Sequence, residues 1–298
     1  MIISTSTDTC PLCVDLDGTL IATDTLMESI LIMIKAKPWL AFLLPLWILK
    51  GKLYFKQSIH KYAVPQAKDL PYNVDVINFL TAEKSKGRKV ILATASHKPI
   101  ADDIAEHLGI FDEVLGSENG VNLRSSQKKD LLNRLYGEKQ YDYFGDSKAD
   151  IEVFKSARKS YLVNPKRGVE RQANAIGNVA HKFEHGSNKL MLFIKQIRVY
   201  QWAKNLLIFL PILMAHIIPD FHSATTLVLA FLSFGLVASS VYVLNDLLDL
   251  SSDRNHPRKR RRPFASGKLP LPVGFISAPA LLLSGFGLAL AFLNWHFI

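Results

Sequence analysis

Residues 14–20 read VDLDGTL, and this segment sets the expected architecture of the first half of the chain. A short apolar run, 12–16, ends there in two aspartates two positions apart, followed by a glycine. Side chains two apart in an extended strand share a face, so Asp15 and Asp17 can converge on one centre. Two negative charges at one centre require a cation, and carboxylate oxygens suit Mg²⁺. The segment therefore predicts a strand that ends in a magnesium site.

Further apolar runs are typical of strands, and helical patterns lie between them. The runs are at 88–94, 112–116, 141–146 and 160–164, with helical patterns at 100–110 and 128–136. This alternation predicts a parallel, Rossmann-like α/β sheet, in which ligands bind at the carboxyl ends of the strands. The polar residues expected at that edge, beside a helix that Lys128 opens, are Asp15, Asp17, Thr94, Asp146 and Asp150. Carboxylates, a hydroxyl and a lysine together suit phosphoryl transfer, which needs positioning and charge neutralisation.

Residues 26–80 interrupt the alternation between the first two strands. Within them, PWLAFLLPLWIL at 38–49 is apolar, but it is 12 residues long and Pro45 divides it. A membrane-spanning helix needs about 20 residues. The segment is therefore either the buried core of an inserted helical cap or a helix on a membrane surface, and Lys50, Lys52 and Lys56 keep the second interpretation open.

The motifs of residues 10–165 resemble, in number and order, those of the haloacid dehalogenase-like (HAD) hydrolases. The resemblance implies that Asp15 is the nucleophile that forms an aspartyl-phosphate and that Asp17 is the general acid and base. Phosphatase activity is favoured, on a phosphorylated small molecule or a lipid-linked phosphate, because dehalogenases lack an aspartate at the second position. The remaining roles that it implies are phosphoryl-oxygen binding by Thr94 and Lys128, Mg²⁺ binding by Asp146 with Asp15 and the backbone carbonyl of Asp17, and orientation of this metal cluster by Asp150. Lys129 could replace Lys128, although Lys128 fits the spacing of the leucines that follow.

Charge and apolar character both concentrate in the last third of the chain. The sequence has 298 residues and a net charge of +10, and residues 186–298 hold 11 basic and only 4 acidic residues. A soluble nucleic-acid binder is usually polar in its basic part, so nucleic acid is not expected as a partner. Three apolar segments, 206–218, 224–244 and 271–293, predict three transmembrane helices.

The basic loop 254–268 lies between the second and third predicted spans. The positive-inside rule places this loop in the cytoplasm, and with it the amino-terminal domain. We therefore expect a multi-pass protein of a bacterial-type inner membrane. The expected organisation is a hydrolase domain at 1–183 with its cap at about 21–85, a linker at 184–195, and an all-α membrane segment at 196–298.

A second group of carboxylates ends the second predicted span. Asp246, Asp249 and Asp253 are three and four residues apart, hence on one helical face, and Asn245 precedes Asp249 by four. Carboxylates at the end of a membrane helix are costly and mark function by default. The basic run that follows supplies Lys259, Arg260 and Arg262. The pattern suits a magnesium-bound diphosphate, with acids on the metal and bases on phosphate oxygens.

NDLLDLSSD at 245–253 resembles the first signature, NDxxDxxxD, of the UbiA-type membrane prenyltransferases. HPRKRRRP at 256–263 and QWAKN at 201–205 look most like the decaprenyl-phosphate phosphoribosyltransferase branch, which implies that Lys204 binds phosphate. The branch implies 5-phosphoribosyl diphosphate as donor and a polyprenyl phosphate in the membrane as acceptor. Members also carry a second aspartate-rich motif on further helices, so 196–298 corresponds to part of such a domain. The aspartates should therefore either reach the cytoplasmic interface or be covered by association with another membrane chain.

Two other functions fit the same residues. The membrane part could be a prenyltransferase for a small aromatic acceptor, fused to an unrelated phosphatase. The amino-terminal domain could instead be a non-catalytic binding module tethered to the membrane, which the intact set of Asp15, Asp17, Thr94, Lys128 and Asp146 argues against.

Overall fold

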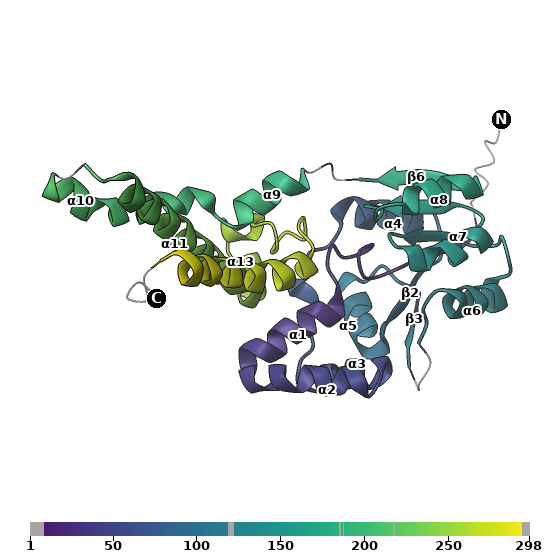
Figure 1. Ribbon diagram of the computed structural model, residues 1–298. Coiled ribbons are helices and arrows are strands. Elements are labelled where there is room, and N and C mark those ends of the chain that lie inside the picture. Colours follow the sequence, from purple (N-terminus) through teal and green to yellow (C-terminus); the bar gives the residue numbers. More distant parts are fainter. Residues whose placement is uncertain (1–8, 119–121, 185, 187, 217, 294–298) are drawn as a thin grey trace. The chain divides into compact units, whose positions relative to one another are not determined.

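The computed structural model describes residues 9–118, 122–184, 186, 188–216 and 218–293. The chain divides into two compact units, Met1–Gly186 and Ser187–Ile298. Figure 1 shows a sheet with helices in the first unit and helices alone in the second.

The first unit is built on a six-stranded, fully parallel sheet with the order β3-β2-β1-β4-β5-β6. Val14 is paired with Leu92 on one side and with Phe144 on the other, so the residues that follow β1, β2 and β4 reach one edge of the sheet. The predicted parallel α/β fold is confirmed. The strands are β1 (Leu12–Val14), β2 (Val90–His97), β3 (Glu113–Ser117), β4 (Asp142–Gly145), β5 (Ser160–Val163) and β6 (Val179–Phe183).

Helices cover both faces of this sheet, because the strands carry apolar side chains on both sides. Leu12 and Val14 pack in one buried cluster and Cys13 in another, because successive side chains of a strand point to opposite faces. The first cluster includes residues of α4 (Val74–Ser85) and α5 (Lys98–Leu108), and the second includes residues of α6 (Ser126–Tyr136), α7 (Ile151–Ser156) and α8 (Val169–Ile176).

The insertion between β1 and β2 forms a group of helices before the chain reaches α4. The Asp24 side chain accepts hydrogen bonds from the N–H groups of Leu26 and Met27 and so caps α1. Pro45 lies in the first turn of α2, where a missing N–H costs nothing. Figure 1 shows α1, α2 and α3 side by side. The elements are α1 (Thr25–Ala36), η1 (Pro38–Leu43), α2 (Leu44–Leu49), α3 (Lys52–Tyr62) and η2 (Ala67–Asp69).

The second unit consists of helices, of which two of those described are long and apolar enough to cross a membrane: α11 (Phe221–Leu248) and α13 (Leu271–Phe292). They pack through small residues, with Ser233 Oγ donating to the Gly285 carbonyl (2.8 Å) and Ser240 Oγ to that of Ala278 (2.7 Å). The shorter elements are α9 (Lys189–Gln196), η4 (Val199–Phe209), α10 (Leu210–Ala215), α12 (Leu250–Asn255) and η5 (Lys259–Arg261).

The first predicted span is not a continuous α-helix. Residues 199–215 form the 3₁₀ segment η4 and then α10, with Pro211 in the first turn of α10. Proline cannot donate the hydrogen bond that an uninterrupted helix needs there. The structure thus gives two helices of spanning length among the described residues, where three were expected.

A buried charge cluster lies at the opposite edge of the sheet from Asp15. The Asp142 carboxylate opens β4 and accepts from Arg88 Nη2 (2.6 Å) and Arg158 Nη2 (2.7 Å). Arg88 also donates to the Cys10 carbonyl before β1 and to Glu83 of α4. The cluster therefore ties the starts of β1, β2 and β4 together.

Asp142→Ala should lower the free energy of unfolding of the first unit by about 3–5 kcal/mol, because it removes the buried carboxylate that accepts from both Arg88 and Arg158. Hydrogen exchange of β1 and β4 in urea, on the full chain in detergent, measures this. Asp102→Ala is the matched control, since its exposed pair with Lys98 (3.1 Å) is worth well under about 1 kcal/mol. Equal protection in the two variants would contradict the assignment.

Candidate active site

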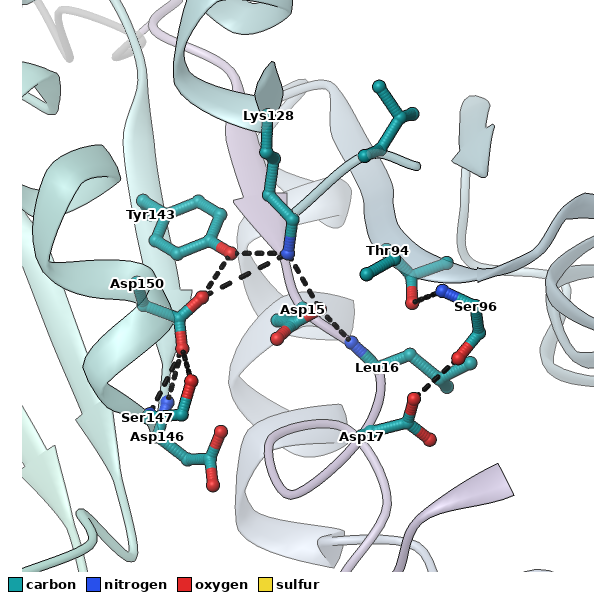
Figure 2. Close-up of polar contacts among 12 residues, drawn as sticks. Asp15, Leu16, Asp17, Thr94, Ser96, Lys128, Tyr143, Asp146, Ser147 and Asp150 are labelled. Atoms are coloured by element: carbon teal, nitrogen blue, oxygen red, sulfur yellow. Dashed lines mark hydrogen bonds and ion pairs between the residues drawn. The ribbon is translucent and has the colours of Figure 1, made fainter. Parts of the chain in front are cut away.

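Lys128 connects the carboxylates that the sequence places at the ends of β1 and β4. Its Nζ donates to Asp15 Oδ1 (2.8 Å) and to the Tyr143 hydroxyl (2.8 Å), and lies 3.9 Å from Asp150 Oδ1. The Tyr143 hydroxyl in turn donates to Asp150 Oδ1 (2.8 Å). Figure 2 shows Asp15 between this group and the side chains of Asp17 and Ser96.

Lys128 rather than Lys129 faces the site. The Lys128 side chain is 4% exposed, whereas Lys129 lies 3.2 Å from the exposed Asp130. Burial alone would lower the pKa of Lys128, but the carboxylates of Asp15 and Asp150 raise it. Burial raises the pKa of Asp15, and the neighbouring Lys128 ammonium opposes that shift. The lysine is therefore a fixed positive charge beside Asp15.

Asp150 is held rigidly after β4. Its Oδ2 accepts from the Ser147 hydroxyl (2.7 Å) and from the N–H groups of Ser147 (3.0 Å) and Asp146 (3.3 Å). This arrangement is a capping box on the short helix η3 (Lys148–Asp150). Both Asp150 oxygens thus serve to orient neighbouring groups.

Asp146 has an oxygen that the described residues do not satisfy. Its Oδ2 forms an ion pair with Lys166 Nζ (2.7 Å), while the buried Oδ1 has no hydrogen-bond partner among them. Burial raises the pKa of Asp146 to about 7, and the neighbouring Lys166 ammonium opposes that shift. Ligand oxygens of Asp15, Asp146 and Asp150 lie within 4.8 Å of one another. The donor set and the orphaned oxygen together fit a hard divalent cation such as Mg²⁺.

Gly18 leaves room for this carboxylate. Its φ is +81°, and a Cβ at this position would meet the Asp146 side chain, with its carboxylate carbon only 2.6 Å away. A residue with a side chain would therefore both strain the backbone and displace Asp146.

Asp17 has hydrogen-bond partners other than Lys128, Tyr143 and Asp150. Its Oδ1 accepts from the Thr25 N–H (2.8 Å) and its Oδ2 from the Ser96 hydroxyl (2.5 Å). Burial, with a contribution from the Asp24 charge, raises the pKa of Asp17 to about 7. A carboxyl group with such a pKa can both give and take a proton near neutral pH. Thr94 is buried on β2 and its hydroxyl accepts from the Ser96 N–H (3.0 Å).

In the second unit, arginines meet two of the three predicted aspartates. Arg262 Nη1 donates to Asp246 Oδ1 (3.0 Å) and to Asp253 Oδ2 (2.6 Å). Asp246 also accepts from Arg198 Nη2 (2.6 Å) and from Gln196 Nε2 (2.8 Å). Both carboxylates are buried, at 3% and 1% exposure. The structure thus brings Asp246, Asp253 and Arg262 together.

The other residues predicted to bind the diphosphate are more exposed than Asp246 and Asp253. The helix α11 ends at Leu248, and Asp249 lies at the break before α12 begins, which interrupts the shared face expected from the spacing. Lys259 Nζ is 3.9 Å from Asp253. The residues of the predicted set that are exposed are Asp249, Asn245, Lys204, Lys259 and Arg260.

Two family models match this chain. Residues 12–155 match the haloacid dehalogenase-like hydrolases, and residues 206–298 match the UbiA prenyltransferase family. The chain therefore joins a HAD-like hydrolase domain to a segment of the UbiA prenyltransferase family, as the motifs indicated. Both are families of enzymes, and the second is membrane-integral.

The curated relatives are longer than this chain. The uncharacterized protein y4nM of Sinorhizobium fredii is 36% identical over 94% of this chain and 54% of its own length. Decaprenyl-phosphate phosphoribosyltransferase of Corynebacterium glutamicum is 39% identical over 32% of this chain and 30% of its own length. The chain thus spans about half or less of these relatives. A solved apo structure of phosphoserine phosphatase has a TM-score of 0.43 and 15% identity, over 62% of this chain and 98% of that one.

Gly18→Ala should destabilise the first unit more than Gly87→Ala. Both positions have positive φ, +81° and +90°, but only at Gly18 would a Cβ meet another group. Strain costs about 1–2 kcal/mol at either position, and the collision should add about 1–3 kcal/mol at Gly18. Urea denaturation of the full chain in detergent, with and without magnesium chloride, measures both. The Gly87 variant should keep any stabilisation by magnesium and the Gly18 variant should lose it, whereas identical behaviour would refute the steric account.

Proposed function

We propose that the first unit is a Mg²⁺-dependent phosphatase that acts through an aspartyl-phosphate on Asp15. The observation that carries the proposal is the placement of Lys128 against Asp15, with Asp146 and its unsatisfied oxygen in the same cluster. The residues proposed to hold and surround the metal are Asp15, Asp146 and Asp150, together with the backbone carbonyl of Asp17. The ion would neutralise charge on the phosphoryl group.

The residues divide the reaction between them. Oδ1 of Asp15 accepts from the Leu16 N–H (2.9 Å) and from Lys128, and we therefore propose Oδ2 as the oxygen that attacks phosphorus. As the Asp15–phosphorus bond forms and the ester bond breaks, Asp17 gives its proton to the departing oxygen. Asp17 then removes a proton from the water that hydrolyses the aspartyl-phosphate. Lys128 and Thr94 bind the phosphoryl oxygens throughout.

We propose that the second unit is part of a transferase that carries a phosphoribosyl group from 5-phosphoribosyl diphosphate to a polyprenyl phosphate. The support is the match to the UbiA family and to relatives named for that reaction. Asp246, Asp249 and Asp253 would bind the magnesium diphosphate. The phosphate oxygens would be held by Asn245, Lys204, Lys259, Arg260 and Arg262. Arg262 compensates the two buried carboxylates in the present structure and would move to phosphate when the metal takes its place.

A single chemical sequence would connect the two activities. The proposed transfer gives a lipid-linked ribose that still carries a 5-phosphate, and a phosphatase on the same chain would remove it. The transferase requires the remaining helices of its domain, from the whole protein or from an associated membrane chain, and 199–215 would supply the third span. The basic loop and the phosphatase would then both lie in the cytoplasm.

Asp15→Asn should lower the rate of Mg²⁺-dependent hydrolysis of a phosphate monoester by at least about 10³-fold, because an amide cannot act as the attacking carboxylate. The measurement is phosphate release by the full chain in detergent, with and without EDTA. Asp102→Asn, at a half-exposed aspartate of the same unit, should keep the parent rate. Parent-level activity in the Asp15 variant would sink the assignment.

A reporter fused after Leu269 should read cytoplasmic, and one fused at Asp220 should read external, if the basic loop faces the cytoplasm. Paired alkaline phosphatase and fluorescent protein fusions in bacterial cells measure this. A reversed pattern would place the phosphatase outside and would remove its access to a product made in the cytoplasmic leaflet.

A further inference from the structure

The segment Pro38–Leu49, made of η1 and α2, presents large apolar side chains outward. Leu40 and Trp47 are buried, and Trp47 stacks on Tyr62 of α3. The other side of the segment is exposed, to 83% at Phe42, 83% at Leu49 and 62% at Trp39, with Leu43, Leu46 and Ile48 also exposed. A buried cap core thus accounts for only part of this segment. Six large apolar side chains exposed on one short segment indicate a binding face.

Charge around the segment shows what could cover that face. Between Glu28 and Asp69 the sequence has seven lysines and no acidic residue. Lys37 and Lys50 stand directly at the two ends of the segment, with Nζ 5.4 Å from the Tyr62 ring centroid and 5.0 Å from that of Tyr54. Apolar side chains with tryptophan, bordered by lysine, complement the acyl boundary and anionic headgroups of a bilayer.

We propose that Pro38–Leu49 docks on an anionic lipid bilayer, in the membrane that also holds α11 and α13. Twelve residues are too few to span the hydrocarbon core, so the segment would lie in the plane of the interface. Because the same chain carries helices of spanning length, the bilayer is present at high effective concentration and weak docking suffices.

Two helices connect the docking segment to the catalytic edge. The helix α1 starts at Thr25, whose N–H bonds Asp17, and its 12 residues, about 18 Å, end just before Pro38. From α3, Lys56 Nζ donates to the Ala95 carbonyl (3.1 Å), beside Ser96. Docking would thus hold the catalytic edge close to the bilayer. The inferred substrate class, which rests on the proposed function, is a phosphate monoester anchored in the membrane by a lipid chain.

Spin labels test the docking independently of any activity. Phe42→Cys, Leu49→Cys and the control Asp130→Cys are each made in Cys10→Ser, since Cys13 is fully buried. The full chain is labelled and placed in vesicles of phosphatidylcholine and phosphatidylglycerol. Labels at 42 and 49 should collide with oxygen more than with a nickel chelate, and the label at 130 should do the reverse. Equal access of the chelate to all three sites would overturn the proposal, as would dipolar coupling between labels at 42, which shows that a second copy covers the face.

A kinetic comparison tests the substrate class. The double variant Phe42→Glu with Leu49→Glu should hydrolyse p-nitrophenyl phosphate within twofold of the parent, and a polyprenyl-phosphoryl-ribose 5-phosphate in the same vesicles at least tenfold more slowly. An equal effect on both substrates, or on neither, would overturn the inferred class. If the parent hydrolyses neither substrate, the result would count against the proposed phosphatase, while the spin labels would still decide the docking.

Discussion

The ion pair between Lys128 and Asp15 is the interaction on which the rest of the first unit depends. Oxygens of three carboxylates lie within 4.8 Å of one another in a largely buried place, where like charges repel strongly. The Lys128 ammonium donates to Asp15, and it reaches Asp150 both directly and through the Tyr143 hydroxyl. Its positive charge offsets the repulsion among these carboxylates. A divalent cation at Asp146 would complete the compensation, and the same arrangement would then bind a phosphoryl group.

The order of the strands brings these charged side chains to one place. With β1 between β2 and β4, the residues after three strands meet at one edge, and Gly18 leaves the space that Asp146 fills. The chain leaves that edge through Thr25, the partner of Asp17, where α1 begins, and α1 leads to the apolar segment Pro38–Leu49. In the second unit the same principle recurs, because Arg262 and Arg198 compensate carboxylates that would otherwise be buried without a counter-charge.

The parallel sheet and the two family memberships could be predicted because they depend on local patterns: apolar runs, spacing of aspartates, and the basic loop. The contribution of Tyr143 to the site could not be predicted, since it lies in a buried strand and its sequence context is that of an ordinary core residue. The pairing of Lys166 with Asp146 could not be predicted either, because the two are distant in sequence and the lysine resembles any surface lysine. The first predicted span is not confirmed, because Pro211 lies within the apolar stretch and interrupts its helical hydrogen bonds. The prediction that Asp246, Asp249 and Asp253 share one face assumed an unbroken helix, but α11 ends at Leu248.

The central claim is that Asp15 becomes covalently phosphorylated. Full-length chain mixed with a ³²P-labelled phosphate monoester and Mg²⁺, quenched in acid and digested, gives the most direct test. The account predicts an acid-stable, hydroxylamine-sensitive label on the peptide that contains Asp15, which borohydride reduction converts to homoserine at that position. Steady hydrolysis with no label on this peptide, or with label on another residue, would contradict it.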